Sequence, residues 1–236
     1  MRIGFFGDSF CADIESYQEY KTYISLLQQH YHAEIANLGH GGSSVYDLLE
    51  LQLSPFLYDN HLDVYVFVWT DSMRLFHRTV RNLNISSVPD HTDDPILRAA
   101  RDFYKYLCDP KIQHLQYVAT LKYIDSNILP SIPATSKIIH LWSFGQLPSV
   151  AWEGRDFDFA DIEYDHNWQN GVELRPSLVT LTMATQRMDK IATQKVPNHI
   201  QGVELNQHLA DIIIDVIDNY HDYSQAGLTV DKLIKL

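Results

Sequence analysis

Apolar residues occur along this chain in two patterns, as short continuous runs and as longer stretches with helical spacing. The runs have the length of strands that are buried on both faces of a sheet. They cover residues 2–6, 34–38, 64–69 and 137–142. The run at 64–69 reads Val-Tyr-Val-Phe-Val-Trp, and its β-branched and aromatic residues favour a strand. We therefore predict that residues 64–69 form a central strand.

Between and after these runs, apolar residues recur every three or four positions, which predicts amphipathic helices. The helical stretches are residues 20–31, 44–53, 96–107, 112–128 and 203–220. Strands that alternate with helices form a parallel sheet with helices on both faces and right-handed crossovers. The predicted fold class is α/β, a three-layer α/β/α sandwich with a mostly parallel sheet.

The carboxyl ends of parallel strands meet at one edge of a sheet, and ligands bind outside that edge. Four polar or glycine-rich turns follow the predicted strands directly. They are Gly7-Asp8-Ser9, residues 39–42, Thr70-Asp71 and residues 143–145. We expect these turns to lie together and to form the functional site.

The length of 236 residues suits a single domain that spans residues 1–236. Within it, residues 148–176 are acidic, aromatic and without a regular pattern. We predict that they form a long loop or a small subdomain, because structureless loops of this length are uncommon in compact domains. The aromatic residues from Trp152 to Trp168 either offer a platform for sugar rings or pack on the domain as a hydrophobic lid.

Charge and hydropathy narrow the range of partners. The formal net charge of −12 argues against a nucleic acid and against an anionic membrane surface. No apolar stretch approaches the roughly 18 residues of a transmembrane helix, and no apolar leader precedes the first strand. We expect a cytoplasmic protein, although export by a non-classical route or packaging into a virus particle stays open. The oligomeric state is not indicated.

The sequence gives little support for a metal site or for a nucleotide-binding site. The two cysteines, Cys11 and Cys108, do not make a disulfide framework, and the 12 histidines lack the spacing of a zinc site. We predict no metal and no cofactor. Residues 4–9 also lack the Gly-x-Gly-x-x-Gly spacing that cradles phosphate, which argues against a nucleotide-binding domain.

Ser9 follows the first strand in a tight turn that begins at Gly7, a position from which its hydroxyl can point out of the sheet edge. A serine needs a base within hydrogen-bond reach to act as a nucleophile. Asp8 and Asp71 are expected to support their turns by accepting hydrogen bonds from backbone N–H groups. Arg74 is expected to pair with a nearby acid rather than to bind an anionic group of a substrate.

Four segments resemble the sequence blocks of the SGNH/GDSL hydrolases, in the family's order. They are Phe-Gly-Asp-Ser-Phe at 6–10, Asn-Leu-Gly-His-Gly-Gly-Ser at 37–43, residues 67–74, and Pro-Asn-His at 197–199. The resemblance implies a flavodoxin-like sheet of five strands. It implies that Ser9 is the nucleophile and His199 its base. It also implies an oxyanion hole formed by the N–H groups of Ser9 and Gly42 and by the side chain of residue 70.

The chain departs from the family pattern at two positions. Thr70 stands where the family has an asparagine that donates to the oxyanion, and a threonine hydroxyl is a shorter donor. Val196 stands where the family has the aspartate that orients the histidine. A backbone carbonyl near Val196 would give a Ser–His dyad, whereas an acid from the 150s–160s would complete a triad. Both alternatives remain open.

These residues predict a serine esterase that acts through a Ser–His dyad or triad on a small acyl ester. By analogy with the family, the substrates include O-acetyl groups on carbohydrate. The alternative is a non-catalytic carbohydrate-binding or structural domain that keeps the fold with a degraded site. The substitutions at Thr70 and Val196 are the evidence for this alternative.

Overall fold

The computed structural model describes most of the chain outside the 145–200 region. The described residues are 1–12, 21–59, 61–81, 83–84, 88–144, 166, 168–175, 177–178, 200, 202–225 and 229–230. Among them no helix is both long and apolar enough to cross a bilayer.

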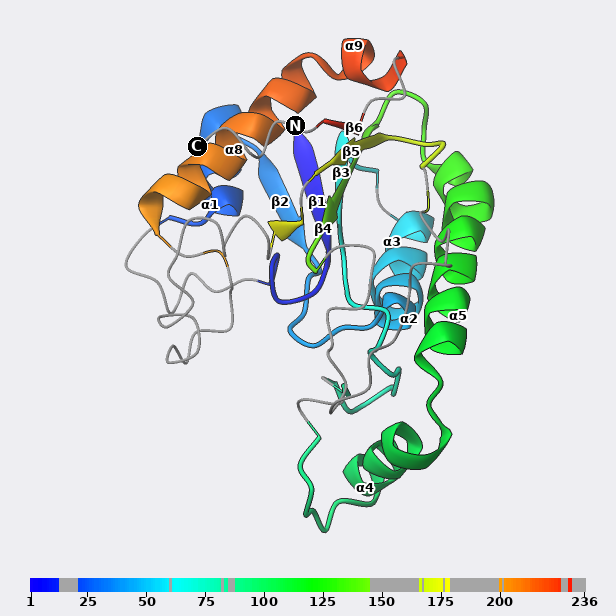
Figure 1. Ribbon diagram of the computed structural model, residues 1–236. Helices are drawn as coiled ribbons and strands as arrows, with labels where there is room; N and C mark the ends of the chain where they lie inside the picture. The colour runs from blue at the N-terminus through cyan, green and yellow to red at the C-terminus, as the bar shows by residue number, and fades with distance from the viewer. Residues whose placement is uncertain are drawn as a thin grey trace.

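The core of the fold is a parallel sheet (Figure 1). Its strands are β1 (Arg2–Gly7), β2 (Glu34–Asn37), β3 (Val64–Trp69), β4 (Lys137–Trp142), β5 (Val172–Leu174) and β6 (Thr229–Val230). They lie in the order β2-β1-β3-β4-β5-β6, and every neighbouring pair is parallel. The first five strands confirm the flavodoxin-like order, and the two-residue β6 extends one edge.

The strand pattern decides which side chains each face presents, because successive residues of a strand point to opposite faces. In β3, Val64, Val66 and Val68 belong to one hydrophobic cluster, and the aromatic residues between them belong to the other. One face of the sheet is therefore mainly aliphatic and the other mainly aromatic.

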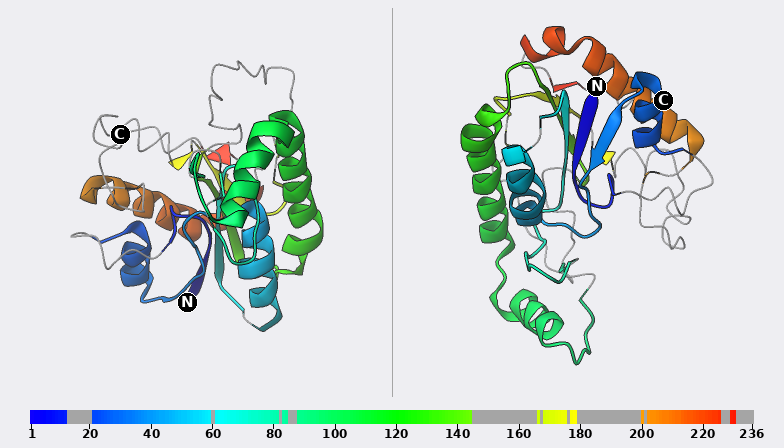
Figure 2. Two further views of the ribbon diagram at one scale, coloured as in Figure 1. Left: turned by 90° about the horizontal axis from the view of Figure 1, so that it is seen from below. Right: turned by 180° about the vertical axis from the view of Figure 1, so that it is seen from behind.

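Helices cover both faces, which confirms the three-layer α/β/α sandwich (Figure 2). α1 (Tyr23–Tyr31) and α8 (Val203–Asp218) pack on the aliphatic face, where Leu27 and Leu209 are fully buried. On the aromatic face lie α2 (Val45–Asp47), the π-helical segment η2 (Leu48–Leu53), α3 (Ser54–Asp59) and α5 (Pro110–Tyr123).

The remaining helical segments lie outside these two layers or extend them. They are α4 (Pro95–Asp102), η3 (Phe103–Leu107), η4 (Ile124–Ile128), η5 (Leu129–Ser131) and α9 (Tyr220–Gln225). α4 lies beyond the carboxyl ends of the strands, at the bottom of Figure 1. The predicted helical stretches at 96–107 and 112–128 are thus confirmed, each with a π-helical last part.

The segment predicted as an insertion at 148–176 is regular at its end, since β5 lies within it at Val172–Leu174. Before β5, Trp168 stacks on the buried imidazole of His140, with ring centroids 3.9 Å apart. His140 Nδ1 accepts a hydrogen bond from Trp69 Nε1 at 3.1 Å, and Nε2 donates to the carbonyl of Asn170 at 2.7 Å. Burial lowers the pKa of His140 to about 3, so the imidazole is neutral. Trp168 therefore packs against the sheet.

Asp125, in η4, binds the segment before β5 that contains Trp168. Its carboxylate accepts hydrogen bonds from the backbone N–H groups of Gln169 (2.9 Å) and Asn170 (3.2 Å), and it lies 3.2 Å from His166 Nε2. Burial raises the pKa of Asp125, but the hydrogen bonds from His166, Gln169 and Asn170 outweigh burial and lower the pKa overall. The ionised carboxylate thus stabilises the fold.

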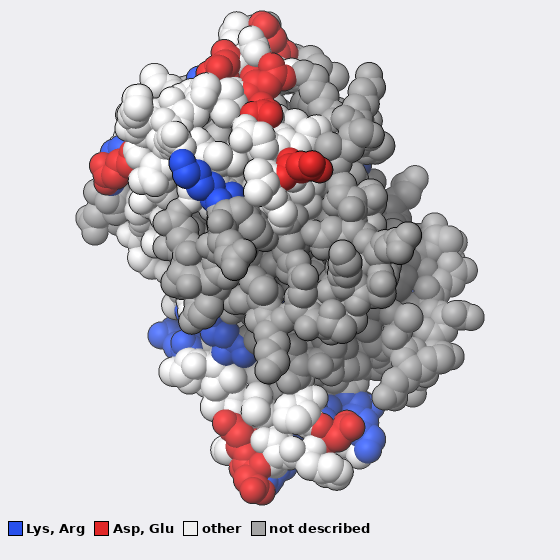
Figure 3. Space-filling view, turned by 90° about the vertical axis from the view of Figure 1, so that its left-hand side faces the viewer, with Lys and Arg blue, Asp and Glu red and all other residues white. Residues whose placement is uncertain are grey.

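The described surface carries charge of both signs. On the face with α1 and α8, acidic and basic side chains of the described residues form separate small groups (Figure 3). A groove of about 670 Å³ between these helices is lined by Asp211, Asp215, Asp218 and His30, among others. Its lining residues do not include the turns that follow β1, β2 and β3.

We predict that Asp125→Asn lowers the free energy of unfolding by about 1–3 kcal/mol at neutral pH. The amide N–H of the new side chain would face N–H donors that now point at a carboxylate. The folded-state pKa lies below the unfolded value of about 3.9. The contribution of Asp125 is therefore present above that value and is lost as the pH falls through the folded-state pKa. Urea unfolding followed by circular dichroism at neutral pH and at about pH 3 measures both effects.

Glu34→Gln is the control for this experiment, because the Glu34 side chain is 68% exposed and its ion pair with Arg2 lies at the surface. We expect its stability to stay within about 0.5 kcal/mol of the wild type. Equal stability of Asp125→Asn and the wild type at neutral pH would contradict the prediction.

Candidate active site

Ser9 lies in the turn that follows β1, between β1 and the loop after β2. The carbonyl of Asp8 accepts hydrogen bonds from the N–H groups of Cys11 (3.1 Å) and Ala12 (3.0 Å), which closes the turn around Ser9. Ser9 is 7% exposed, and no described residue hydrogen-bonds to its side chain. The hydroxyl is thus not committed to a contact within the described fold.

Gly7 is required at the end of β1 because neighbouring atoms leave no room for a side chain. A Cβ at this position would lie 2.4 Å from the carbonyl oxygen of Val68. The buried side chain of Gln52 binds both backbone groups of Gly7: Oε1 accepts from the N–H at 2.7 Å, and Nε2 donates to the carbonyl at 2.9 Å. Gln52 was not identified from the sequence, because it lies in a helical segment 45 residues away.

The loop after β2 is hydrogen-bonded directly to the Ser9 turn. Asn37 Nδ2 donates to the carbonyl of Cys11 at 2.7 Å, and the N–H of His40 donates to the carbonyl of Gly7 at 3.1 Å. Gly39 packs so closely on Cys11 that a Cβ would lie 2.4 Å from the Cys11 sulfur. The Asn-x-Gly pair of this motif therefore joins the two turns.

Gly42 has φ +77°, in the left-handed region that a glycine enters without strain. The next residue, Ser43, donates from its N–H and from Oγ to the carbonyl of His40, at 3.2 and 2.8 Å. Ser44 then begins α2 with a capping box to Asp47, whose Oδ2 accepts from the N–H of Ser44 at 2.8 Å. Gly42 is thus held between a hydrogen-bonded turn and a capped helix.

Thr70 follows β3 at the same edge. Its carbonyl accepts a hydrogen bond from the hydroxyl of Tyr117 at 2.7 Å, which fixes the backbone. Its own Oγ1 is buried and has no hydrogen-bond partner in the described part of the chain. A buried hydroxyl without a partner costs about 1–3 kcal/mol. Within the described residues, the hydroxyl therefore contributes no hydrogen bond to the fold.

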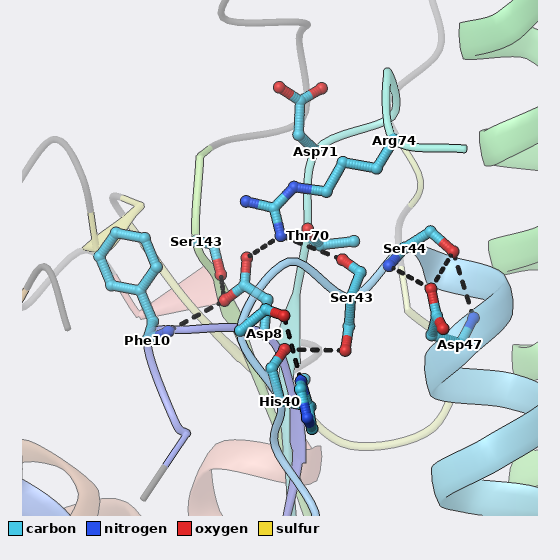
Figure 4. Close-up of polar contacts among 12 residues, drawn as sticks. Asp8, Phe10, His40, Ser43, Ser44, Asp47, Thr70, Asp71, Arg74 and Ser143 are labelled. Carbon is cyan, nitrogen blue, oxygen red and sulfur yellow. Dashed lines mark hydrogen bonds and ion pairs between the residues drawn. The ribbon is translucent and has the colours of Figure 1, made fainter. Parts of the chain in front are cut away.

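Asp8 joins three strand ends through its buried carboxylate (Figure 4). Oδ1 accepts hydrogen bonds from the N–H of Phe10 at 3.1 Å and from Ser143 Oγ, after β4, at 2.8 Å. Oδ2 lies 3.3 Å from Nη1 of Arg74, in the turn after β3. The acid that pairs with Arg74 is thus Asp8.

Asp71 has a more local contact, since its Oδ1 accepts a hydrogen bond from the N–H of Met73 at 2.8 Å. In Figure 4 its carboxylate points away from the guanidinium of Arg74. Among the described residues, no group of three or more histidine, cysteine or carboxylate side chains has the arrangement of a metal site.

The structure thus places Ser9, Gly42 and Thr70, together with Asp8 and Asp71, in neighbouring turns at one edge of the sheet. His199, Val196 and the acidic residues between Asp156 and Asp165 lie outside the described residues. The partners of the histidine therefore stay as the sequence predicts them, a dyad or a triad.

No protein-family model matches the chain, and no curated protein matches it. Solved structures do. A putative GDSL-like lipase from Parabacteroides merdae is 13% identical with a TM-score of 0.46, and the alignment covers 92% of this chain and 95% of the lipase. GDSL-like lipases belong to the family that the sequence motifs resemble.

Two further solved structures are similar at the same level. LAE5, an alpha/beta hydrolase from the metagenome of Lake Arreo, is 12% identical with a TM-score of 0.46, over 92% of this chain and 94% of LAE5. The acetyl xylan esterase Est2A from Butyrivibrio proteoclasticus is 11% identical with a TM-score of 0.45, over 94% of this chain and 64% of Est2A. At these identities and TM-scores, the similarities assign neither an activity nor a substrate to this chain.

Proposed function

We propose that this chain is a serine ester hydrolase in which Ser9 attacks the carbonyl carbon of a small acyl ester. The observation that carries the proposal is the direct hydrogen bonding between the Ser9 turn and the Gly42 loop. His40 and Asn37 make these bonds, at 3.1 and 2.7 Å. They hold the Ser9 turn against the loop that carries Gly42, whose N–H is the proposed donor to the oxyanion in acyl transfer.

In the proposed reaction, His199 takes the proton from Ser9 as the hydroxyl attacks the carbonyl carbon. The N–H groups of Ser9 and Gly42 and the hydroxyl of Thr70 stabilise the negative charge that develops on the carbonyl oxygen. His199 then protonates the departing alcohol. In the second half of the reaction, His199 takes a proton from water, the water attacks the acyl-enzyme, and His199 returns the proton to Ser9 as the acid is released. An imidazole is suited to this exchange because its ordinary pKa is about 6.5.

Thr70 supports the proposal through its burial. The hydroxyl is costly to the fold as long as it has no hydrogen-bond partner. A substrate oxyanion would be such a partner, and the position matches the third donor of the related family. Among the described residues, nothing else occupies this hydroxyl, so it is free to donate to the oxyanion in the reaction.

The proposed substrate class is small acyl esters, with O-acetyl groups on carbohydrate among them. Ser9 is only 7% exposed, so the ester group has to enter the turn to reach the hydroxyl.

The competing proposal, a non-catalytic domain with a degraded site, is favoured by Thr70 and Val196. The ester hydrolase and the non-catalytic domain would have the same fold. They differ in whether Ser9 is reactive. A fluorophosphonate probe, which forms a covalent bond to an activated serine, therefore separates them.

We predict that the purified wild type is labelled by a fluorophosphonate and hydrolyses p-nitrophenyl acetate, and that Ser9→Ala and His199→Ala each abolish both reactions. The reason is that the serine is a weak nucleophile without its base. Intact-protein mass spectrometry measures the label, and release of nitrophenolate measures turnover.

Ser136→Ala is the matched control, because Ser136 is also 7% exposed and hydrogen-bonds to the carbonyl of Leu62. It is expected to keep labelling and turnover. A folded wild type that neither takes the label nor hydrolyses the ester would instead establish the non-catalytic alternative.

We predict that Thr70→Val lowers kcat by about 10²-fold, because it removes one donor to the oxyanion. The same change should raise the free energy of unfolding by about 1 kcal/mol, because a methyl group replaces a buried hydroxyl without a partner. Thr70→Asn, which restores an amide donor, is expected to keep at least the wild-type kcat. Steady-state kinetics and urea unfolding measure the two effects. A Thr70→Val variant with wild-type kcat would exclude the hydroxyl as a donor.

A further inference from the structure

Two buried side chains meet at Ser43, the residue that follows the proposed donor Gly42. Arg74 Nη1 donates to the carbonyl of Ser43 at 3.0 Å and pairs with Asp8 Oδ2 at 3.3 Å. Gln52 Nε2 donates to Ser43 Oγ at 3.2 Å, while it also binds the carbonyl of Gly7. The two side chains therefore connect the Ser9 turn to the Gly42 loop from two sides.

The charges around Arg74 argue against a role in binding an anion. Its guanidinium pairs with the fully buried carboxylate of Asp8, and Asp71 lies in the same turn (Figure 4). Nη1 of Arg74 is therefore already engaged by the Asp8 carboxylate and by the carbonyl of Ser43. An anionic substrate group would have to displace these contacts, so we infer that the guanidinium acts on the protein itself.

We propose that Arg74 is a positioning residue that, through the carbonyl of Ser43, holds the Gly42 loop against the Ser9 turn. This inference rests on the proposed ester hydrolysis. One nitrogen, Nη1, contacts both turns, so that the separation between them is limited by the lengths of one hydrogen bond and one ion pair. The N–H groups of Ser9 and Gly42 are thereby directed at the same carbonyl oxygen.

The planar shape of the Arg74 guanidinium also contributes to its position. The carbon Cζ of Arg74 lies 5.1 Å from the centroid of the Phe144 ring, so that the head group is held between an aromatic ring and the two acceptors. An arginine suits this place better than a lysine because a planar, delocalised group stacks on a ring and an ammonium group does not. Arg74→Lys keeps the positive charge but loses the planar group that stacks on Phe144, so it is the conservative variant.

The test compares Arg74→Gln, Arg74→Lys and the wild type in steady-state hydrolysis of p-nitrophenyl acetate. We expect Arg74→Gln to lower kcat by about 10- to 100-fold with KM changed less than threefold, because misplaced donors weaken transition-state binding. Arg74→Lys should recover part of kcat. The rate of fluorophosphonate labelling should fall in parallel, since the phosphonyl oxygen uses the same donors.

Arg101→Gln is the matched control. Arg101 also bridges a carboxylate and a backbone carbonyl, those of Asp102 (2.7 Å) and Asp90 (2.7 Å), and it belongs to α4. Its loss should leave kcat unchanged. Thermal unfolding of each variant identifies the temperature at which all of them are folded, and kinetics are measured below it.

Loss of Arg74 leaves the Asp8 carboxylate buried without its ion-pair partner, which destabilises the fold. If Arg74→Gln does not fold, Asp8→Asn/Arg74→Gln is compared with Asp8→Asn instead. A kcat about tenfold lower in the double variant supports the positioning role, and equal values overturn it.

The outcomes separate this inference from the proposed function. Hydrolysis that persists in Ser9→Ala would overturn the proposed function, and the inference with it. Hydrolysis that depends on Ser9 but is unchanged in folded Arg74→Gln would overturn the inference alone. A fall in kcat that Arg74→Lys partly reverses supports both.

Discussion

The buried carboxylate of Asp8 is the contact on which the geometry of the site depends. A carboxylate without exposed surface is tolerated only where donors surround it, and here the donors come from three different strand ends. Phe10 follows β1, Arg74 follows β3, and Ser143 follows β4. The requirement to satisfy one charge therefore fixes the relative positions of turns that are up to 135 residues apart in the sequence.

Much of the fold follows from local pattern. The runs at 2–6, 34–38, 64–69 and 137–142 form strands because an uninterrupted apolar run fits a strand that is covered on both faces. The common edge of the turns then follows from parallel pairing alone. β5 was missed because it has only three residues and lies within an acidic, aromatic stretch, where no periodicity marks it.

The site could be predicted only in part. Ser9, the Asn-x-Gly pair and Gly42 carry recognisable local signals, since a tight turn or a close approach requires particular residues there. Gln52 and Ser143 carry none, because their roles come from contacts with Gly7 and Asp8 across long stretches of sequence. The partner of Arg74 was likewise open until the fold placed Asp8 beside it.

The aromatic face of the sheet has a consequence for spectroscopy. Three of the four tryptophans in the chain, Trp69, Trp142 and Trp168, lie in one cluster, in which Trp168 stacks on both Trp69 and the neutral imidazole of His140. Trp168 belongs to the segment that leads into β5, whereas Trp69 and Trp142 belong to the central strands. The intrinsic emission of Trp69, Trp142 and Trp168 therefore reports on the packing of that segment against the central strands.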